Sequence, residues 1–195
     1  MGQVLAVISG KGGTGKTSVC AGVAGCLCME GARVLCIDAD LGLRNLDISL
    51  GMASEAGLSF LDVMRGDYAI EQAPRAAGLP GLQLLTAPVS VKVDEIDRGA
   101  FEALIHDAKE RYDWVLIDAP AGVGAGFELA VRFADELVVV CLADPASQRD
   151  AARAAELALS RRDVPARLVV NRVSPRLFQK MNATIDDIMD GVGLP

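Results

Sequence analysis

A glycine-rich octapeptide near the amino terminus carries the residue types that bind phosphate. Gly10–Thr17 reads Gly-Lys-Gly-Gly-Thr-Gly-Lys-Thr, which satisfies the pattern GxxxxGK[ST]. Glycines let successive backbone N–H groups converge on phosphate oxygens, and the helix expected to follow points its positive end at the same oxygens. The sequence therefore predicts a nucleotide-phosphate site in this loop.

Side chains of the same loop suggest separate roles. Lys16 is expected to pair with the β- and γ-phosphates, Thr17 to offer its hydroxyl to Mg²⁺, and Ser18 to contact the α-phosphate. Lys11 is a cation that a plain phosphate loop does not require, so it is either solvated or reaches a phosphate in a facing subunit. The predicted nucleotide-binding backbone comprises Gly12, Gly13, Thr14 and Gly15.

Three carboxylates stand where expected strands end. Asp38 and Asp40 follow one strand, and Asp118 ends another. Carboxylates beside bound phosphate repel it unless Mg²⁺ intervenes, so we predict Asp38 near the metal, Asp40 near the attacking water and Asp118 holding Mg²⁺ through water. An Asp-rich turn that caps the next helix is the alternative for Asp38 and Asp40. Gly122 has the backbone freedom to turn its N–H toward a γ-phosphate.

Short β-branched runs alternate with longer helical patterns, and these elements must position the site. Hydrophobic residues form 51% of the chain and aromatic residues 4%, which suits a buried parallel sheet under Ala- and Leu-rich helices. The prediction is an α/β, three-layer P-loop NTPase fold with a mostly parallel sheet and helices on both faces. Expected strands are Val4–Ser9, Arg33–Asp38, Leu82–Thr86, Trp114–Asp118, Leu137–Leu142 and Arg167–Asn171. Expected helices are Lys16–Glu30, Ala100–Arg111, Gly126–Ala134, Ala146–Arg161 and Leu177–Met189.

Three segments together resemble one family. Lys11–Ser18 is similar to KGGxGKT[ST], Asp38–Asp47 to DxDxGLRNLD, and Asp118–Gly122 to DxPAG. These are the phosphate loop, switch I and switch II of the deviant Walker A ATPases, and the second wording resembles the MinD-like septum site-determining branch more than the ParA branch. The resemblance covers essentially the whole chain. It departs at Asp144-Pro145, where that branch usually has Pro-Glu.

The resemblance implies a weak ATPase that uses ATP/ADP and Mg²⁺ and regulates placement of the cell-division site. It implies an ATP-dependent homodimer in which Lys11 crosses to the partner's nucleotide. It also implies a division-inhibitor partner, an ATPase-stimulating partner and a cytoplasmic location with peripheral contact to the inner membrane surface. Asn171 would read the adenine, although an Asn that caps a turn is an equally good interpretation.

Alternative functions remain open at this point. A flagellar-number regulator and a ParA-type partition ATPase belong to the same family, although flagellar regulators tend to read GLAN at 42–45. A metabolic kinase or synthetase that passes phosphate to a small molecule is the alternative of another class. Such enzymes usually lack a lysine at the position of Lys11, and size analysis with Mg-ATP or a metabolite screen separates the two classes.

Charge and length limit the remaining functions. The net charge of −7 makes nucleic acid an unlikely partner. Residues 145–180 nevertheless carry eight basic and three acidic side chains, which indicates either a solvated helix face or a docking surface. We expect 1–195 to be one domain that lacks the C-terminal strand and membrane-targeting helix of full-length relatives. The five cysteines, without a CxxC pair, are expected to be buried free thiols.

Overall fold

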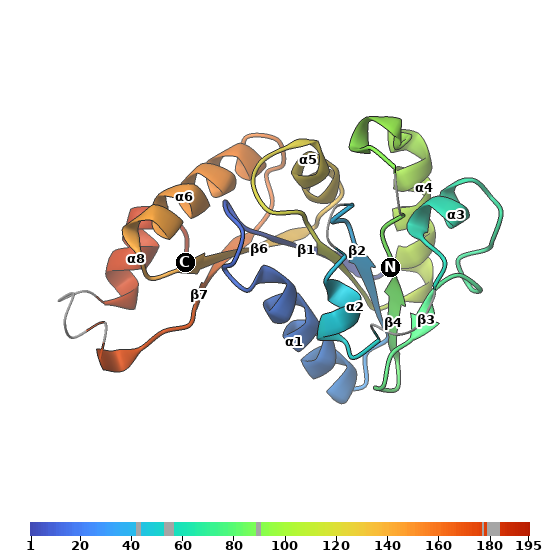
Figure 1. Cartoon of the computed structure of the whole chain (residues 1–195), viewed down its shortest axis with the longest axis horizontal. Helices are drawn as coiled ribbons and strands as arrows, with labels where there is room; N and C mark the ends of the chain where they lie inside the picture. Colours follow the sequence, from blue (N-terminus) through green and yellow to red (C-terminus); the bar gives the residue numbers. More distant parts are fainter. Residues whose placement is uncertain (42–43, 53–56, 89–90, 177, 179–183) are drawn as a thin grey trace.

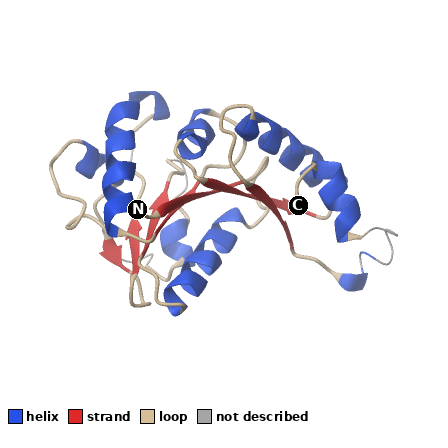
Figure 2. Cartoon of the chain, turned by 180° about the vertical axis from the view of Figure 1, so that it is seen from behind, coloured by secondary structure: helices blue, strands red, loops and turns tan. Residues whose placement is uncertain are grey.

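The fold is built on a twisted β-sheet that lies between layers of helices (Figures 1 and 2). The computed structural model describes residues 1–41, 44–52, 57–88, 91–176, 178 and 184–195. The strands are β1 Gln3–Ile8, β2 Val34–Asp38, β3 Arg75–Ala76, β4 Leu82–Leu85, β5 Trp114–Asp118, β6 Glu136–Leu142 and β7 Ala166–Asn171. The helices are α1 Lys16–Met29, α2 Leu46–Ser49, α3 Phe60–Met64, α4 Arg98–Arg111, α5 Ala125–Arg132, α6 Pro145–Leu159 and α8 Ile185–Val192, with a 3₁₀ turn η1 at Val93–Glu95.

Seven strands pair in the order β3-β4-β2-β5-β1-β6-β7. Every neighbouring pair is parallel except β3 with β4, which form an antiparallel edge. Parallel strands end at the same edge of a sheet, so β1, β2 and β5 deliver their following loops to one place. The register sets Asp38 of β2 directly beside Asp118 of β5.

Alternate residues of each central strand pack into different cores. Val4, Ala6 and Ile8 of β1 face the cluster formed with α3, α4, α5, α6 and α8, whereas Leu5 and Val7 face α1. This period of two is the signature of a strand that is buried on both sides. Figure 1 shows the resulting layers, with α1 and α2 below the sheet and α4, α5 and α6 above it.

Helix α1 contacts the sheet along a narrow stripe. Its buried residues are Lys16, Cys20, Ala24 and Cys28, one on every turn, and small thiols and methyl groups let the helix approach the strands closely. Four of the five cysteines are buried as predicted. Cys26 is the exception, because it lies on the outer side of α1 and is exposed.

The structure confirms the predicted fold class and moves several boundaries by one or two residues. It adds the two-residue strand β3 and the short helices α2 and α3, which carry too few residues for a periodic pattern. The first part of the helix expected at Leu177–Met189 lies outside the described residues, because 177 and 179–183 are not described. Helix α8 begins after Thr184, whose side chain accepts a hydrogen bond from the Asp187 N–H while Asp187 bonds back to Thr184, a capping box.

Candidate nucleotide-binding site

The loop between β1 and α1 is held in a conformation that favours glycine at two positions. Gly13 and Gly15 have φ angles of 79° and 88°, in the left-handed region. A Cβ atom at Gly15 would also lie 2.3 Å from the side-chain nitrogen of Asn171. Gly15 is the N-cap of α1 and makes no side-chain hydrogen bond to the helix, which leaves the positive end of α1 open toward the loop.

A cavity of about 260 Å³ lies against this loop. We call it the P-loop cavity. It is lined by Ser9, Lys11, Gly12, Gly13, Thr14, Gly15, Lys16, Thr17, Ser18, Asp40, Asn45, Ser49, Ala121 and Arg172. The structure thus brings the predicted phosphate loop from Lys11 to Ser18 together with Asp40. The lining residues Asn45, Ser49 and Arg172 were not assigned a role from sequence, and Asn45 stands inside the segment that resembles switch I.

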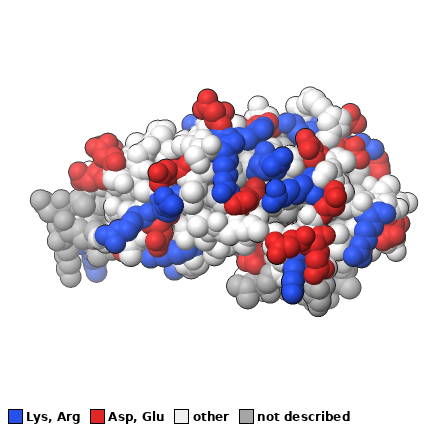
Figure 3. Space-filling model, turned by 90° about the horizontal axis from the view of Figure 1, so that it is seen from above, with Lys and Arg blue, Asp and Glu red and all other residues white. Residues whose placement is uncertain are grey.

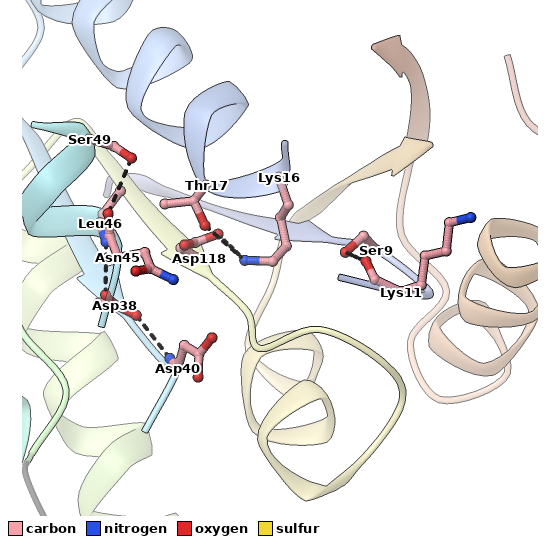
Figure 4. A network of polar contacts seen from close by, with 10 residues as sticks. All are labelled: Ser9, Lys11, Lys16, Thr17, Asp38, Asp40, Asn45, Leu46, Ser49 and Asp118. Carbon is pink, nitrogen blue, oxygen red and sulfur yellow. Dashed lines mark hydrogen bonds and ion pairs between the residues drawn. The ribbon is translucent and has the colours of Figure 1, made fainter. Parts of the chain in front are cut away.

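The buried cation of the site is Lys16, and its partner is Asp118. Their side chains are 7% and 1% exposed and form a short ion pair at the end of β5 (Figure 4). Thr17 also hydrogen-bonds Asp118, and the Lys16 ammonium lies 3.4 Å from the Thr17 hydroxyl oxygen. Burial raises the pKa of Asp118, while Lys16 and the Thr17 hydrogen bond oppose that rise. Three residues predicted to hold phosphate or Mg²⁺ therefore converge on one point.

Asp38 organises the loop that follows β2. Its carboxylate accepts hydrogen bonds from the N–H groups of Asp40 at 2.9 Å and Leu46 at 3.1 Å. Burial, with a smaller contribution from the charge of Asp118, raises the pKa of Asp38 to about 6, although the two N–H donors act against this rise. Asp38 therefore pins both ends of the 40–46 segment, of which residues 42 and 43 lie outside the described residues.

Two further predicted site residues, Asp40 and Gly122, differ in their position relative to the P-loop cavity. Asp40 lines the P-loop cavity. Gly122 has a φ angle of 85°, and its N–H donates to the Ser9 carbonyl at 3.2 Å, so it ties switch II to the phosphate loop. Ala121 rather than Gly122 lines the cavity. The predicted γ-phosphate contact of Gly122 stays a prediction that requires this hydrogen bond to exchange.

Lys11 extends away from the Lys16 cluster (Figure 4). Its ammonium lies 3.2 Å from a carboxylate oxygen of Asp144, and the two side chains are 33% and 46% exposed. Asp144 is the N-cap of α6 and accepts a hydrogen bond from the Ser147 N–H, which lowers the pKa of Asp144, with a further contribution from Lys11. The residue at which the chain departs from the family pattern is thus the partner of Lys11.

Asn171 contacts the phosphate loop at the end of β7. Its side-chain nitrogen donates to the Thr14 carbonyl at 2.8 Å, and its oxygen accepts from the N–H of Arg172. Arg172 is in the left-handed region with φ 54°. Adenine recognition by Asn171 stays a prediction, and in this structure the side chain holds the loop instead.

The geometry fits a bound nucleotide. The Thr14 hydroxyl is buried in the loop and has no hydrogen-bond partner among the described residues, which is costly unless a ligand satisfies it. The uncapped end of α1 and the cavity beside Lys16 offer N–H donors and a cation to the same ligand. Oxygen atoms of Thr17, Asp38 and Asp118 are the type that Mg²⁺ prefers.

Comparisons with known proteins show the family to which the chain belongs. A family model described as an AAA domain matches residues 2–153. The septum site-determining protein MinD of Synechocystis sp. is 36% identical over 198 residues, which cover 100% of this chain and 74% of that protein. The chain belongs to the MinD family.

Solved structures extend the MinD likeness to three dimensions. The MinC:MinD cell division protein complex of Aquifex aeolicus matches with a TM-score of 0.85 at 33% identity, covering 98% of this chain and 78% of that chain. MinD of Pyrococcus horikoshii, solved with Mg-ADP, matches with a TM-score of 0.84 at 27% identity, covering 100% and 79%. These MinD structures share the mostly parallel sheet and its flanking helices.

In the part of the chain that the structure describes, no helix combines the length and the apolar character that crossing a bilayer demands.

Proposed function

We propose that this chain is a Mg-ATP-dependent ATPase that dimerises with ATP and regulates where the cell divides. The observation that carries the proposal is the arrangement of two lysines on one glycine-rich loop. Lys16 is buried beside Asp118 and Thr17, whereas Lys11 is half-exposed and points outward. One lysine serves the nucleotide of its own subunit, and the other is available to a facing subunit.

The residues assigned to the nucleotide have complementary tasks. Lys16 pairs with the terminal phosphates once it leaves Asp118, and the N–H groups of the loop bind the phosphate oxygens. Thr17, Asp38 and Asp118 hold Mg²⁺, which neutralises phosphate charge when it is bound. Asp40 orients the attacking water, and because none of the residues assigned to the cavity is a glutamine, we expect slow hydrolysis that a partner stimulates.

The biological role follows from the relatives. The Synechocystis relative is a septum site-determining protein, and the A. aeolicus relative was solved as a complex with MinC. We therefore infer a division-inhibitor protein as a partner of this chain. An ATPase-stimulating partner and attachment to the inner face of the cell membrane belong to the same proposal.

Lys11→Ala tests the switch. The variant is expected to bind one Mg-ATP per monomer with unchanged affinity and to stay monomeric in light scattering, whereas the wild type dimerises. Asp144→Asn is the matched control, since it weakens the ion pair to Lys11 but keeps a side chain that caps α6. Its dimerisation should persist. An ATP-dependent dimer of Lys11→Ala would remove the proposed role of Lys11.

A further inference from the structure

A second hollow lies in the helical layer above the sheet, far along the sequence from the phosphate loop. It has a volume of about 640 Å³, and the P-loop cavity has about 260 Å³. Four arginines line it: Arg98 of α4, Arg132 of α5, and Arg161 and Arg162 after α6. We call this hollow the arginine groove. Figure 3 shows basic side chains gathered in the middle of that face of the molecule.

Two of the four arginines already have partners within the chain. Arg161 pairs with Glu128 at 2.6 Å. Arg162 donates a hydrogen bond to the Ala134 carbonyl at 2.8 Å and lies 4.0 Å from Asp135. These contacts fix one wall of the groove, and they leave their guanidinium groups partly exposed, at 43% and 41%.

The other two arginines, Arg98 and Arg132, form no ion pair with another described residue. Within the described ranges, neither Arg98 nor Arg132 has a carboxylate within ion-pairing distance, and both are exposed. The guanidinium carbon of Arg132 lies 5.9 Å from the centroid of the Phe133 ring. Guanidinium groups are weakly hydrated and bind carboxylates in a two-pronged geometry, so an uncommitted pair in a groove favours an anionic ligand.

The groove is positive on a protein that is negative overall. Its charged lining consists of four arginines and two glutamates, Glu102 and Glu128, whereas the whole chain carries a net charge of −7. Such a local reversal of sign gathers acidic ligands and turns them toward one face. The walls also carry Leu129 and the partly exposed ring of Phe133, so the groove has apolar surface as well as charge.

The positive charge and the apolar surface of the groove together favour some kinds of anionic ligand over others. Neither a polyphosphate nor the phosphate backbone of a nucleic acid makes use of the apolar surface that Leu129 and Phe133 add to the groove. An acidic peptide spaces its carboxylates along a backbone and carries apolar side chains between them. We propose that the arginine groove is a docking surface for an acidic, partly apolar segment of a partner protein, with Arg98 and Arg132 as its anchors.

Fluorescence anisotropy of a labelled decapeptide of alternating glutamate and leucine tests the proposal on the full chain. The wild type is expected to bind it at low salt, and Arg98→Glu/Arg132→Glu should weaken binding by at least about tenfold, because two attractions become repulsions. Arg65→Glu/Arg176→Glu is the matched control. It makes the same change in net charge at exposed arginines outside the groove and should bind within about twofold of the wild type.

Further arms identify the ligand class. A twenty-nucleotide DNA, polyphosphate and phosphatidylglycerol vesicles should each bind more weakly than the peptide. The same peptide with glutamine in place of every glutamate carries no side-chain charge and should not bind. Equal loss in the control variant, no binding by the wild type, or stronger binding of DNA or vesicles would each overturn the proposal. Arg98→Gln/Arg132→Gln should bind the peptide more weakly at an unchanged melting temperature, which shows that the loss of binding does not come from a folding defect.

Discussion

The P-loop cavity and the arginine groove both concentrate charge, but in different surroundings. Lys16 and Asp118 are almost fully buried at the end of a central strand, whereas Arg161 and Glu128 are about two-fifths exposed on a helical surface. Buried charges interact strongly and tolerate the loss of a partner poorly, whereas water and salt screen exposed charges. The burial of the first region suits the proposed chemistry on a bound nucleotide, and the exposure of the second suits the proposed reversible contact with a partner.

The contrast has a structural origin. The carboxyl ends of β1, β2 and β5 lie side by side in the middle of the sheet, and the register sets Asp38 against Asp118. Charged side chains at this edge of the sheet are enclosed by the neighbouring loops. The arginine groove draws its residues from α4, α5 and the end of α6, whose outer faces meet solvent. The position of a charged side chain in the fold thus decides how strongly it interacts with its neighbours.

The largest effect is expected at Lys16. Lys16→Ala should lower affinity for Mg-ATP by at least about 100-fold, since it removes a charge-assisted contact and leaves Asp118 buried without its cation. Isothermal titration calorimetry measures the change, with Lys92→Ala as the control at an exposed lysine outside the P-loop cavity. If Lys16→Ala bound Mg-ATP within threefold of the wild type, the buried pair would have no part in the site.

The next effect is a pH dependence of the free energy of unfolding that arises from the buried carboxyl of Asp38. The pKa of Asp38 is about 6 in the folded chain against 3.8 for the free group. Between those values the folded chain holds a proton that the unfolded chain has lost. The free energy of unfolding contributed by Asp38 therefore falls by roughly 3 kcal/mol as pH rises from about 4 to 6, and it is level above that.

Asp38→Asn isolates this contribution. Urea unfolding at pH 4.5, 5.5 and 7.5 without nucleotide should show the fall in the wild type and a flatter profile in the variant. Asp187→Asn is the contrasting control, because the Thr184 hydrogen bonds lower the pKa of its exposed carboxyl below the free value of 3.8, so its loss should leave the shape of the profile at these three pH values unchanged. Parallel profiles for the wild type and Asp38→Asn would contradict the assigned environment of Asp38.

The smallest effect is expected at the wall of the groove. Glu128→Gln should lower the free energy of unfolding by less than about 1 kcal/mol, because its ion pair with Arg161 is exposed. A double-mutant cycle with Arg161→Gln, run at 0.05 M and 0.5 M salt, measures the pair, and the coupling should vanish at the higher salt. A coupling that is large and independent of salt would erase the contrast between the two regions.

Local motifs made the first region predictable from sequence. Gly10–Thr17 is one continuous motif, and Asp38 and Asp118 each end an apolar strand. The positions of the strand ends and the spacing of the motif were therefore sufficient to predict these site residues. The partner of Lys11 was not predictable, since Asp144 lies 133 positions away and becomes a neighbour only when α6 packs beside the loop. A Cβ atom at Gly10 would lie 2.0 Å from the Asp150 carbonyl oxygen, which shows how close that packing is.

The second region was only half visible in the sequence. The basic stretch 145–180 indicated either a solvated helix face or a docking surface, but its members separate in the fold. Arg153 pairs with Glu156, Arg167 pairs with Glu136, and Arg172 lines the P-loop cavity. Among the described basic residues of that stretch, only Arg161 and Arg162 line the groove, where Arg98 and Arg132 join them from distant segments. Charge counts along a chain therefore locate a surface less reliably than motifs locate a site.

The central claim is that ATP bound in the P-loop cavity drives this chain into a dimer. The most direct measurement is the mass of Asp40→Ala by size-exclusion chromatography with light scattering, since this variant should bind Mg-ATP but hydrolyse it poorly. The account predicts a mass of twice 20.4 kDa with Mg-ATP and of 20.4 kDa with Mg-ADP. A mass that is the same with both nucleotides would contradict the claim.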